Sequence, residues 1–148
     1  MRRVPAVRAL PCLGVVGISL LVASCSFGGF ASDAAPPAGC VDDNRECIDR
    51  RGMALKSMMA DKSHRWVKEP ATAVAYASGV RLFAYKSRKR DLTCNELAHG
   101  KREADAAPLA LSGPSAAGLS PAQKSRGSLL AGEVSKELGA EMKRRCKA

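Results

Sequence analysis

The chain has 148 residues and carries 24 Lys and Arg against 14 Asp and Glu, a net charge of +10. This length allows one small domain with a modest hydrophobic core and excludes several domains within this sequence. The two histidines stand in no nucleophile or metal-binding motif, and the sequence shows no recognisable catalytic or ligand-binding signature.

The first 25 residues follow the order of an export signal. Three arginines among the first eight residues precede an apolar run from Leu10 to Val22, and Ala23, Ser24 and Cys25 come next. The run is about 13 residues long and contains a proline and two glycines, whereas a membrane-spanning helix needs about 20 apolar residues. A cleaved signal is therefore favoured over a retained anchor. The cysteine directly after Ser24 is expected in the lipidated kind of signal and not in an ordinary one, so residues 1–26 resemble a bacterial lipoprotein signal peptide.

The resemblance implies how the protein is processed and where it sits. Residues 1–24 would be removed, and Cys25 would become the first residue, carrying palmitate-type lipid that anchors it to a membrane. Lipoproteins of many diderm bacteria with a residue other than aspartate after this cysteine travel to the outer membrane. Ser26 therefore implies the periplasmic face of the outer membrane in such a host. Nucleic acid is not an expected partner of an exported lipoprotein.

Residues 26–39 are expected to form a flexible linker, because they are rich in Gly, Ala and Pro and offer few groups that pack. The predicted organisation is a signal peptide at 1–24, the lipidated cysteine with its linker at 25–39, and a folded domain at 40–148. Roughly 108 residues give only a small core, so covalent stabilisation is expected.

The folded part contains four cysteines, an even number that an oxidising envelope would pair into two disulfides. They are Cys40, Cys47, Cys94 and Cys146. A four-thiolate zinc site usually has cysteines two to four residues apart, and no such pair occurs here, so no metal is predicted. The lack of a Cys-x-x-Cys motif likewise argues against redox activity.

The first predicted helix is capped by Asp43, with Glu46 three residues later, and runs to about Ala60. Its expected apolar face consists of Ile48, Leu55 and Met59, with Gly52 in the gap. The charged connector that follows contains two residues that are expected to pack, Trp66 and Val67.

The second predicted helix spans residues 71–86, with Pro70 at its start. Residues 80–85 would also fit a buried strand. Helix is favoured because the sequence offers no second convincing strand, and a lone strand leaves its backbone groups without partners.

The third predicted helix begins at Cys94, because Thr93 and Glu96 form a capping box, and it is expected to end before Pro108. A loop at 112–119 separates it from the last helix.

The last helix has the strongest start signal: Ser120 as cap, Pro121 at the first position and Gln123 three residues after the cap. An apolar residue then recurs every fourth position, which predicts a buried stripe. Its members are Leu130, Val134, Leu138 and Met142.

These elements predict an all-α fold, a small three- or four-helix bundle stapled by two disulfides behind a flexible N-terminal tether. An up-and-down order would bring all four cysteines to the same end. If Cys40 and Cys47 were both helical, seven residues would separate them by about 10 Å, beyond disulfide reach. Two pairings then stay open: Cys40 with Cys146 and Cys47 with Cys94, which we prefer, or Cys40 with Cys94 and Cys47 with Cys146. A first helix that starts after Cys47 would restore the local pair.

Two runs of cations are candidate contacts for an anionic lipid, an anionic glycan or an acidic protein. One follows the second predicted helix and the other ends the last helix, and their members are Lys86, Arg88, Lys89, Arg90, Lys143, Arg144 and Arg145. In a bundle both runs would approach the cysteine-rich end and form one basic surface. The simpler interpretation is a solvated turn for the first run and favourable interaction with the helix dipole for the second.

The leading hypothesis is a non-enzymatic envelope lipoprotein, without a cofactor, that acts as an adaptor, tether or assembly accessory. The alternative is a basic binding module or inhibitor for an anionic envelope ligand or an acidic protein. An enzyme is the least supported class. Catalysis would need a pocket that brings His64 or His99 to a carboxylate or a hydroxyl.

Overall fold

The computed structural model describes residues 40–146, and the predicted signal peptide, Cys25 and the linker lie outside this range. The α-helices of the described range are α1 (Arg45–Ala60), α2 (Ala73–Ser78), α3 (Val80–Arg88), α4 (Cys94–Ser112) and α5 (Pro121–Arg145). Two short 3₁₀ turns, η1 (Arg65–Lys68) and η2 (Pro114–Ala116), lie between them, and residues 40–146 contain no strand. The predicted all-α class is confirmed. None of the helices in this range is both long and apolar enough to cross a membrane.

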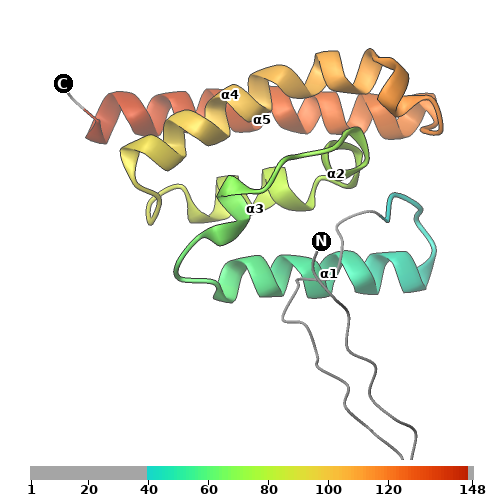
Figure 1. The fold of residues 1–148 in the computed structure, drawn as a ribbon, viewed down its shortest axis with the longest axis horizontal. Helices are drawn as coiled ribbons and strands as arrows, with labels where there is room; N and C mark the ends of the chain where they lie inside the picture. Colours follow the sequence, from blue (N-terminus) through green and yellow to red (C-terminus); the bar gives the residue numbers. More distant parts are fainter. Residues whose placement is uncertain (1–39, 147–148) are drawn as a thin grey trace, which may run out of the picture. The chain divides into compact units, whose positions relative to one another are not determined.

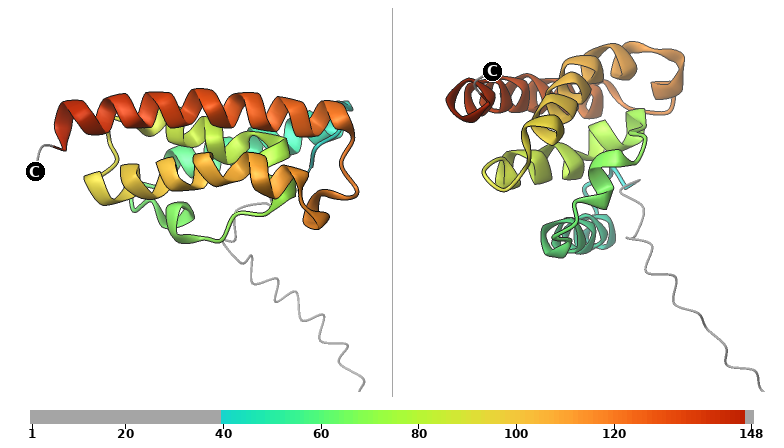
Figure 2. Two further views of the ribbon diagram at one scale, coloured as in Figure 1. Left: turned by 90° about the horizontal axis from the view of Figure 1, so that it is seen from above. Right: turned by 60° about the vertical axis from the view of Figure 1, so that its left-hand side comes forward.

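The helices of residues 40–146 are arranged in three layers (Figures 1 and 2). Helices α4 and α5 form an antiparallel hairpin and pack along their length. Helices α2 and α3 form the middle layer, and α1 contacts α3 on the side away from the hairpin. The stretch between η1 and α2 carries the chain back across the domain, so α1, α3 and α5 run in roughly the same direction (Figure 1).

Local sequence signals set the starts of α4 and α5. Thr93 accepts a hydrogen bond from the backbone N–H of Glu96, and the Glu96 carboxylate accepts one from the backbone N–H of Thr93. Ser120 and Gln123 form the same reciprocal pair at α5, where Pro121 is the first helical residue. Both predicted starts are confirmed. Capping depends on residues only three positions apart, so the sequence alone is enough to predict it.

Helix α1 ends at Ala60 as predicted but differs at its cap and its buried face. Asn44 caps it in place of Asp43, by accepting a hydrogen bond from the backbone N–H of Cys47. The side chains that α1 buries each lie one position before the predicted Ile48, Leu55 and Met59: they are Cys47, Ala54 and Met58. One position turns a helix by about 100°. The disulfide of Cys47 and the contact with α3 together select this face.

The predicted helix at 71–86 is helical but divided in two. Gly79 has a φ of +74°, in the left-handed region, where it ends α2 and precedes α3. A Cβ atom at this position would also lie 3.0 Å from Cδ2 of Leu130. The alternative strand at 80–85 is not formed, since these residues lie within α3.

Helix α4 continues through Pro108 to Ser112, so the prediction that it ends before this proline was wrong. Proline within a helix lacks a backbone donor and costs about 3 kcal/mol in an isolated helix. The Pro108 ring is exposed, while Ala104, Ala107 and Leu111 on the opposite side are fully buried. The burial of Ala104 and Ala107 before the proline and of Leu111 after it outweighs the free-energy cost of the proline.

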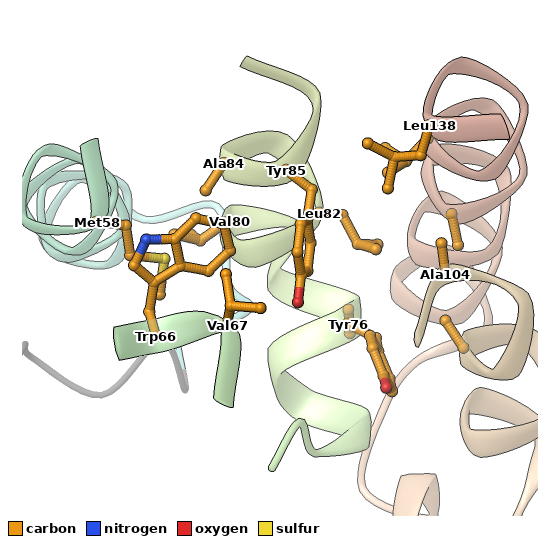
Figure 3. Packing of buried hydrophobic residues seen from close by; sticks show 14 of the residues in the cluster. Met58, Trp66, Val67, Tyr76, Val80, Leu82, Ala84, Tyr85, Ala104 and Leu138 are labelled. Carbon is orange, nitrogen blue, oxygen red and sulfur yellow. The ribbon is translucent and has the colours of Figure 1, made fainter. Parts of the chain in front are cut away.

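The core lies on both sides of α3 (Figure 3). Trp66 and Val67 are buried as predicted, and the Trp66 ring lies between Met58 of α1 and Tyr85 of α3. The centroids of the Trp66 and Tyr85 rings are 4.8 Å apart in an edge-to-face arrangement. The predicted stripe of α5 is confirmed as part of this core, which includes Leu130, Val134, Leu138 and Met142.

All four cysteines form disulfides, but neither predicted pairing is correct. Cys40 is bonded to Cys47, with Cα atoms 5.4 Å apart, and Cys94 to Cys146, with Cα atoms 5.7 Å apart. The 10 Å estimate failed because residues 40–44 precede α1, so the helical rise does not apply to them. The expectation that all four cysteines share one end was also wrong. Val41 accepts a hydrogen bond from Arg126 near the start of α5, whereas Cys146 follows its last residue.

Candidate functional site

The two predicted cationic runs do approach each other. Arg145 donates hydrogen bonds to the backbone carbonyls of Arg90, at 2.7 Å, and Leu92, at 2.5 Å. This junction lies beside the disulfide of Cys94 and Cys146. The predicted proximity of the two runs is thus confirmed, although the other disulfide lies at the opposite end of the domain.

The lysines of the first run are paired with carboxylates of α5. Lys86 Nζ lies 2.5 Å from Glu133 Oε1 and 3.3 Å from Glu137 Oε1, and Lys89 also contacts Glu137. The hydrogen bond with Glu133 raises the pKa of Lys86, and that from Lys89 lowers the pKa of Glu137. These lysines therefore join α3 to α5.

The arginines of the second run are also paired. Arg144 Nη2 lies 2.5 Å and Arg145 Nε 2.8 Å from Oε1 of Glu141. The hydrogen bond from Arg144 is the main cause of the lowered pKa of Glu141. Within residues 40–146, only Arg90 and Lys143 of the predicted cations have no side-chain partner. The anionic-partner hypothesis stays a prediction, and charge reversal at these two residues tests it without breaking internal ion pairs.

Arg88 and the buried His64 belong to a second polar cluster. His64 Nε2 lies 3.2 Å from the Arg88 guanidinium, and Nδ1 lies 3.2 Å from Glu96 Oε1. Because arginine only donates, Nε2 accepts and Nδ1 carries the proton that is donated to Glu96. Arg88 also donates to the carbonyl of Met59 at the end of α1. The cluster ties α1, α3 and α4 together at one corner of the domain, which is a structural role.

A third cluster surrounds Glu103, a carboxylate buried on α4. The Arg81 guanidinium donates hydrogen bonds to this carboxylate from two nitrogens, with Nη2 at 2.9 Å from Oε2. Tyr85 donates to the same oxygen at 2.8 Å. His99 Nδ1 lies 3.3 Å from the Tyr85 hydroxyl and 3.7 Å from Glu103 Oε2. Burial is the main cause of the raised pKa of Tyr85, which keeps its hydroxyl protonated. His99 thus meets both a hydroxyl and a carboxylate.

The polar cleft lies over this cluster, between the end of η1 and α4. Its volume is about 370 Å³ and it is lined by Lys68, Glu69, Pro70, Ala71, His99, Arg102 and Glu103. Arg81 donates to the carbonyls of Trp66, Val67 and Glu69, so it also holds the chain that forms the wall opposite α4. Burial alone would lower the pKa of Arg81, but the contacts with Glu103 outweigh it and raise this pKa.

The apolar groove lies on the other side of α3, where α1, α3 and α5 meet. Its volume is about 390 Å³, and its wall consists of Ile48, Arg51, Gly52, Leu55, Ser78, Gly79, Val80, Phe83 and Leu130. Phe83 is 47% exposed and Ile48 is 49% exposed at its edge. Isolated exposed apolar residues are common, but here two large ones border one hollow.

Sequence reasoning named both histidines but missed the side chains that organise the polar cleft, namely Arg81, Tyr85 and Glu103. A charged residue inside the apolar stretch from Val80 to Tyr85 was the available signal for Arg81. No protein-family model, no curated protein and no solved structure matches the chain. The functional conclusion therefore depends on the residues of this chain alone.

Proposed function

We propose that the protein is a non-enzymatic envelope lipoprotein whose helical domain acts as an adaptor for a partner protein. The N-terminal sequence supports anchoring through Cys25, on the periplasmic face of a bacterial membrane. Two disulfides within 40–146 suit an exported protein, because they persist in oxidising compartments. The proposal assigns the partner contact to the apolar groove.

The exposure of Phe83 and Ile48 at the groove is the observation that carries the adaptor role. Neither side chain belongs to the buried core, to which α3 contributes Val80, Leu82 and Ala84 and α1 contributes Ala54 and Met58. An amphipathic helix of a partner would bury both side chains in the groove. At such contacts a few residues that are packed in desolvated pockets supply most of the binding free energy.

Anchoring is tested by replacing the predicted lipidated cysteine. The Cys25→Ser variant is expected to lose the lipid label and to leave the membrane fraction. The disulfide-bonded domain should still fold, because residue 25 precedes the domain. A Cys25→Ser protein that still carries lipid and sediments with membranes would contradict the anchoring proposal.

The adaptor role is tested by in-cell photo-crosslinking at position 83, followed by mass spectrometry. We expect one reproducible partner that is captured at position 83 and lost with Cys25→Ser. Leu109 is the matched control position, since it is an exposed apolar residue (78%) outside the groove. The reciprocal crosslink, from the partner segment back to the groove, should be retained with Leu109→Asp and lost with Phe83→Asp. Equal capture from both positions would refute a specific groove contact.

A further inference from the structure

We propose that the polar cleft is a binding site for a small organic anion that carries a carboxylate or phosphate group. This inference goes beyond the adaptor role, since the cleft and the apolar groove share no lining residue. The cleft volume of about 370 Å³ falls within the range of about 300–1,000 Å³ that is typical of small-molecule sites. It suits a ligand about the size of one sugar ring.

The charge of the cleft favours an anion. Lys68 and Arg102 border it from opposite walls, both are exposed, and neither has an ion-pair partner among residues 40–146. The charge of Glu103 at the base is balanced by the Arg81 guanidinium, whose side chain is 4% exposed. Glu69 contributes one negative charge. The cleft therefore has a net positive charge.

The hydrogen bonds at the base assign a role to His99. The hydroxyl of Tyr85 has one proton, and this proton is donated to Glu103 Oε2. The contact with Tyr85 then requires His99 Nδ1 to be the donor. In the neutral ring, Nε2 is an acceptor, and protonation of His99 turns it into a second donor. The His99 side chain is 43% exposed, so solvent and ligand can reach it.

The cleft is formed before any ligand arrives. Arg81 joins the carbonyls of Trp66 and Glu69, on either side of the segment that carries Lys68, to Glu103 on α4. Both walls are thus fixed to one buried group, which reduces the ordering that binding would require. Pro70 and Ala71 add an apolar surface for the carbon skeleton of the ligand.

The site is tested with the mature lipidated protein in a neutral detergent, by isothermal titration calorimetry. The probes are galacturonate, glucose 6-phosphate and uncharged glucose. We expect both anions to bind and glucose not to bind. Arg102→Gln and Lys68→Gln should each weaken binding about tenfold, as loss of one charged hydrogen bond predicts. Lys136→Gln is the matched control, because Lys136 is an exposed cation of α5 without a partner in the described range.

A substitution of His99 supplies a readout that general charge attraction would not move in the same way. The groups that face His99 are Tyr85 from α3, Glu103 and Arg102 from α4, and Lys68 and Glu69 from the opposite wall. We expect His99→Phe to weaken the binding of both anions, because it removes the ring nitrogens from the lining of the cleft. An unchanged affinity of His99→Phe would show that His99 takes no part in the site.

A free metabolite and an envelope glycan would present the same anionic group. Equal affinities for monomeric and oligomeric galacturonate indicate a free small molecule, and tighter binding of the oligomer indicates a glycan, so either result supports the site. Failure of both anions to bind, binding of glucose, or an equal loss with Lys136→Gln would overturn the proposal. None of these results bears on crosslinking at the groove.

Discussion

The two sides of α3 are built in different ways. Toward α4 and α5, Arg81 forms an ion pair with Glu103, and Tyr85 donates a hydrogen bond to the same carboxylate. Leu82 is fully buried on this side. Toward α1, the buried contacts are mainly apolar: the Trp66 ring lies between Met58 and Tyr85 (Figure 3), and the small side chains of Ala54 and Ala84 are also buried. The first side is held by buried polar contacts at the base of the polar cleft, and the second side leaves the apolar groove beside α1. The two sides of one helix thus differ in the chemistry of their contacts.

The glycines on the two sides of α3 differ in the space around them. A Cβ atom on Gly100 of α4 would lie 2.6 Å from the Tyr85 ring, and one on Gly127 of α5 would lie 3.0 Å from the carbonyl of Tyr76. A Cβ atom on Gly52 of α1 would meet nothing within 4 Å. These two positions of the hairpin thus leave no room for a side chain, whereas the Gly52 position of α1 is open.

The largest effect is expected from Arg81→Met, which leaves Glu103 buried without its counter-charge. Removal of one partner of a buried pair costs about 3–5 kcal/mol in unfolding free energy. Urea unfolding would measure the loss. The double variant Arg81→Met with Glu103→Leu should recover part of it, because no unpaired charge remains. A single variant no less stable than Lys136→Met would show that the pair does not hold this side of α3 together.

The two disulfides are expected to differ in how much they stabilise the fold, and the one within the hairpin should contribute more. The bond between Cys94 and Cys146 closes a separation of 52 residues and joins α4 to α5, whereas that between Cys40 and Cys47 closes 7 at the start of α1. Chain-entropy arguments assign about 4 kcal/mol to the long loop and about 2.5 kcal/mol to the short one. Thermal unfolding of the two paired Cys→Ser variants would measure both. Equal losses would contradict the contrast.

Adding one methyl group should have opposite effects on the two sides. Gly100→Ala is expected to cost about 1–3 kcal/mol, since the Tyr85 ring or α4 must shift. Gly52→Ala is expected to stabilise the protein by about 0.5–1 kcal/mol, because it restores helix propensity in open space. Urea unfolding of the two variants side by side measures the difference. A destabilised Gly52→Ala protein would show that α1 packs more tightly than its contacts indicate.

The smallest effect concerns pH and the cluster of His64. Burial opposes ionisation of Glu96, but hydrogen bonds from Thr93 and His64 outweigh it and lower the pKa of Glu96 below its ordinary 4.5. A carboxylate with a lowered pKa stabilises the folded state above its unfolded pKa, and this contribution is lost as the pH falls through the folded pKa. The wild type should therefore lose more stability below pH 4.5 than Glu96→Gln does. Parallel acid unfolding curves for the two proteins would contradict this.

The polar cleft shows why only part of the candidate site was predictable. Histidine occurs only twice in this chain, so His99 could be named from the sequence. Its partners Tyr85 and Glu103 lie 14 and 4 positions away in the chain. The contact between α3 and α4 that joins them depends on packing across the turn at 89–93. The ion pairs of Lys86 and Lys89 were not predictable for the same reason, since Glu133 and Glu137 approach these lysines only in the folded chain.

The sequence by itself determined the helical class, the starts of α4 and α5 and the buried stripe of α5. These follow from groups three or four residues apart, whose interactions form within any segment that turns helical. Only the tertiary structure decided the cysteine pairing, the passage of α4 through Pro108 and the face that α1 buries. Each depends on a free energy of packing against a distant segment, and that term is absent until the segments meet.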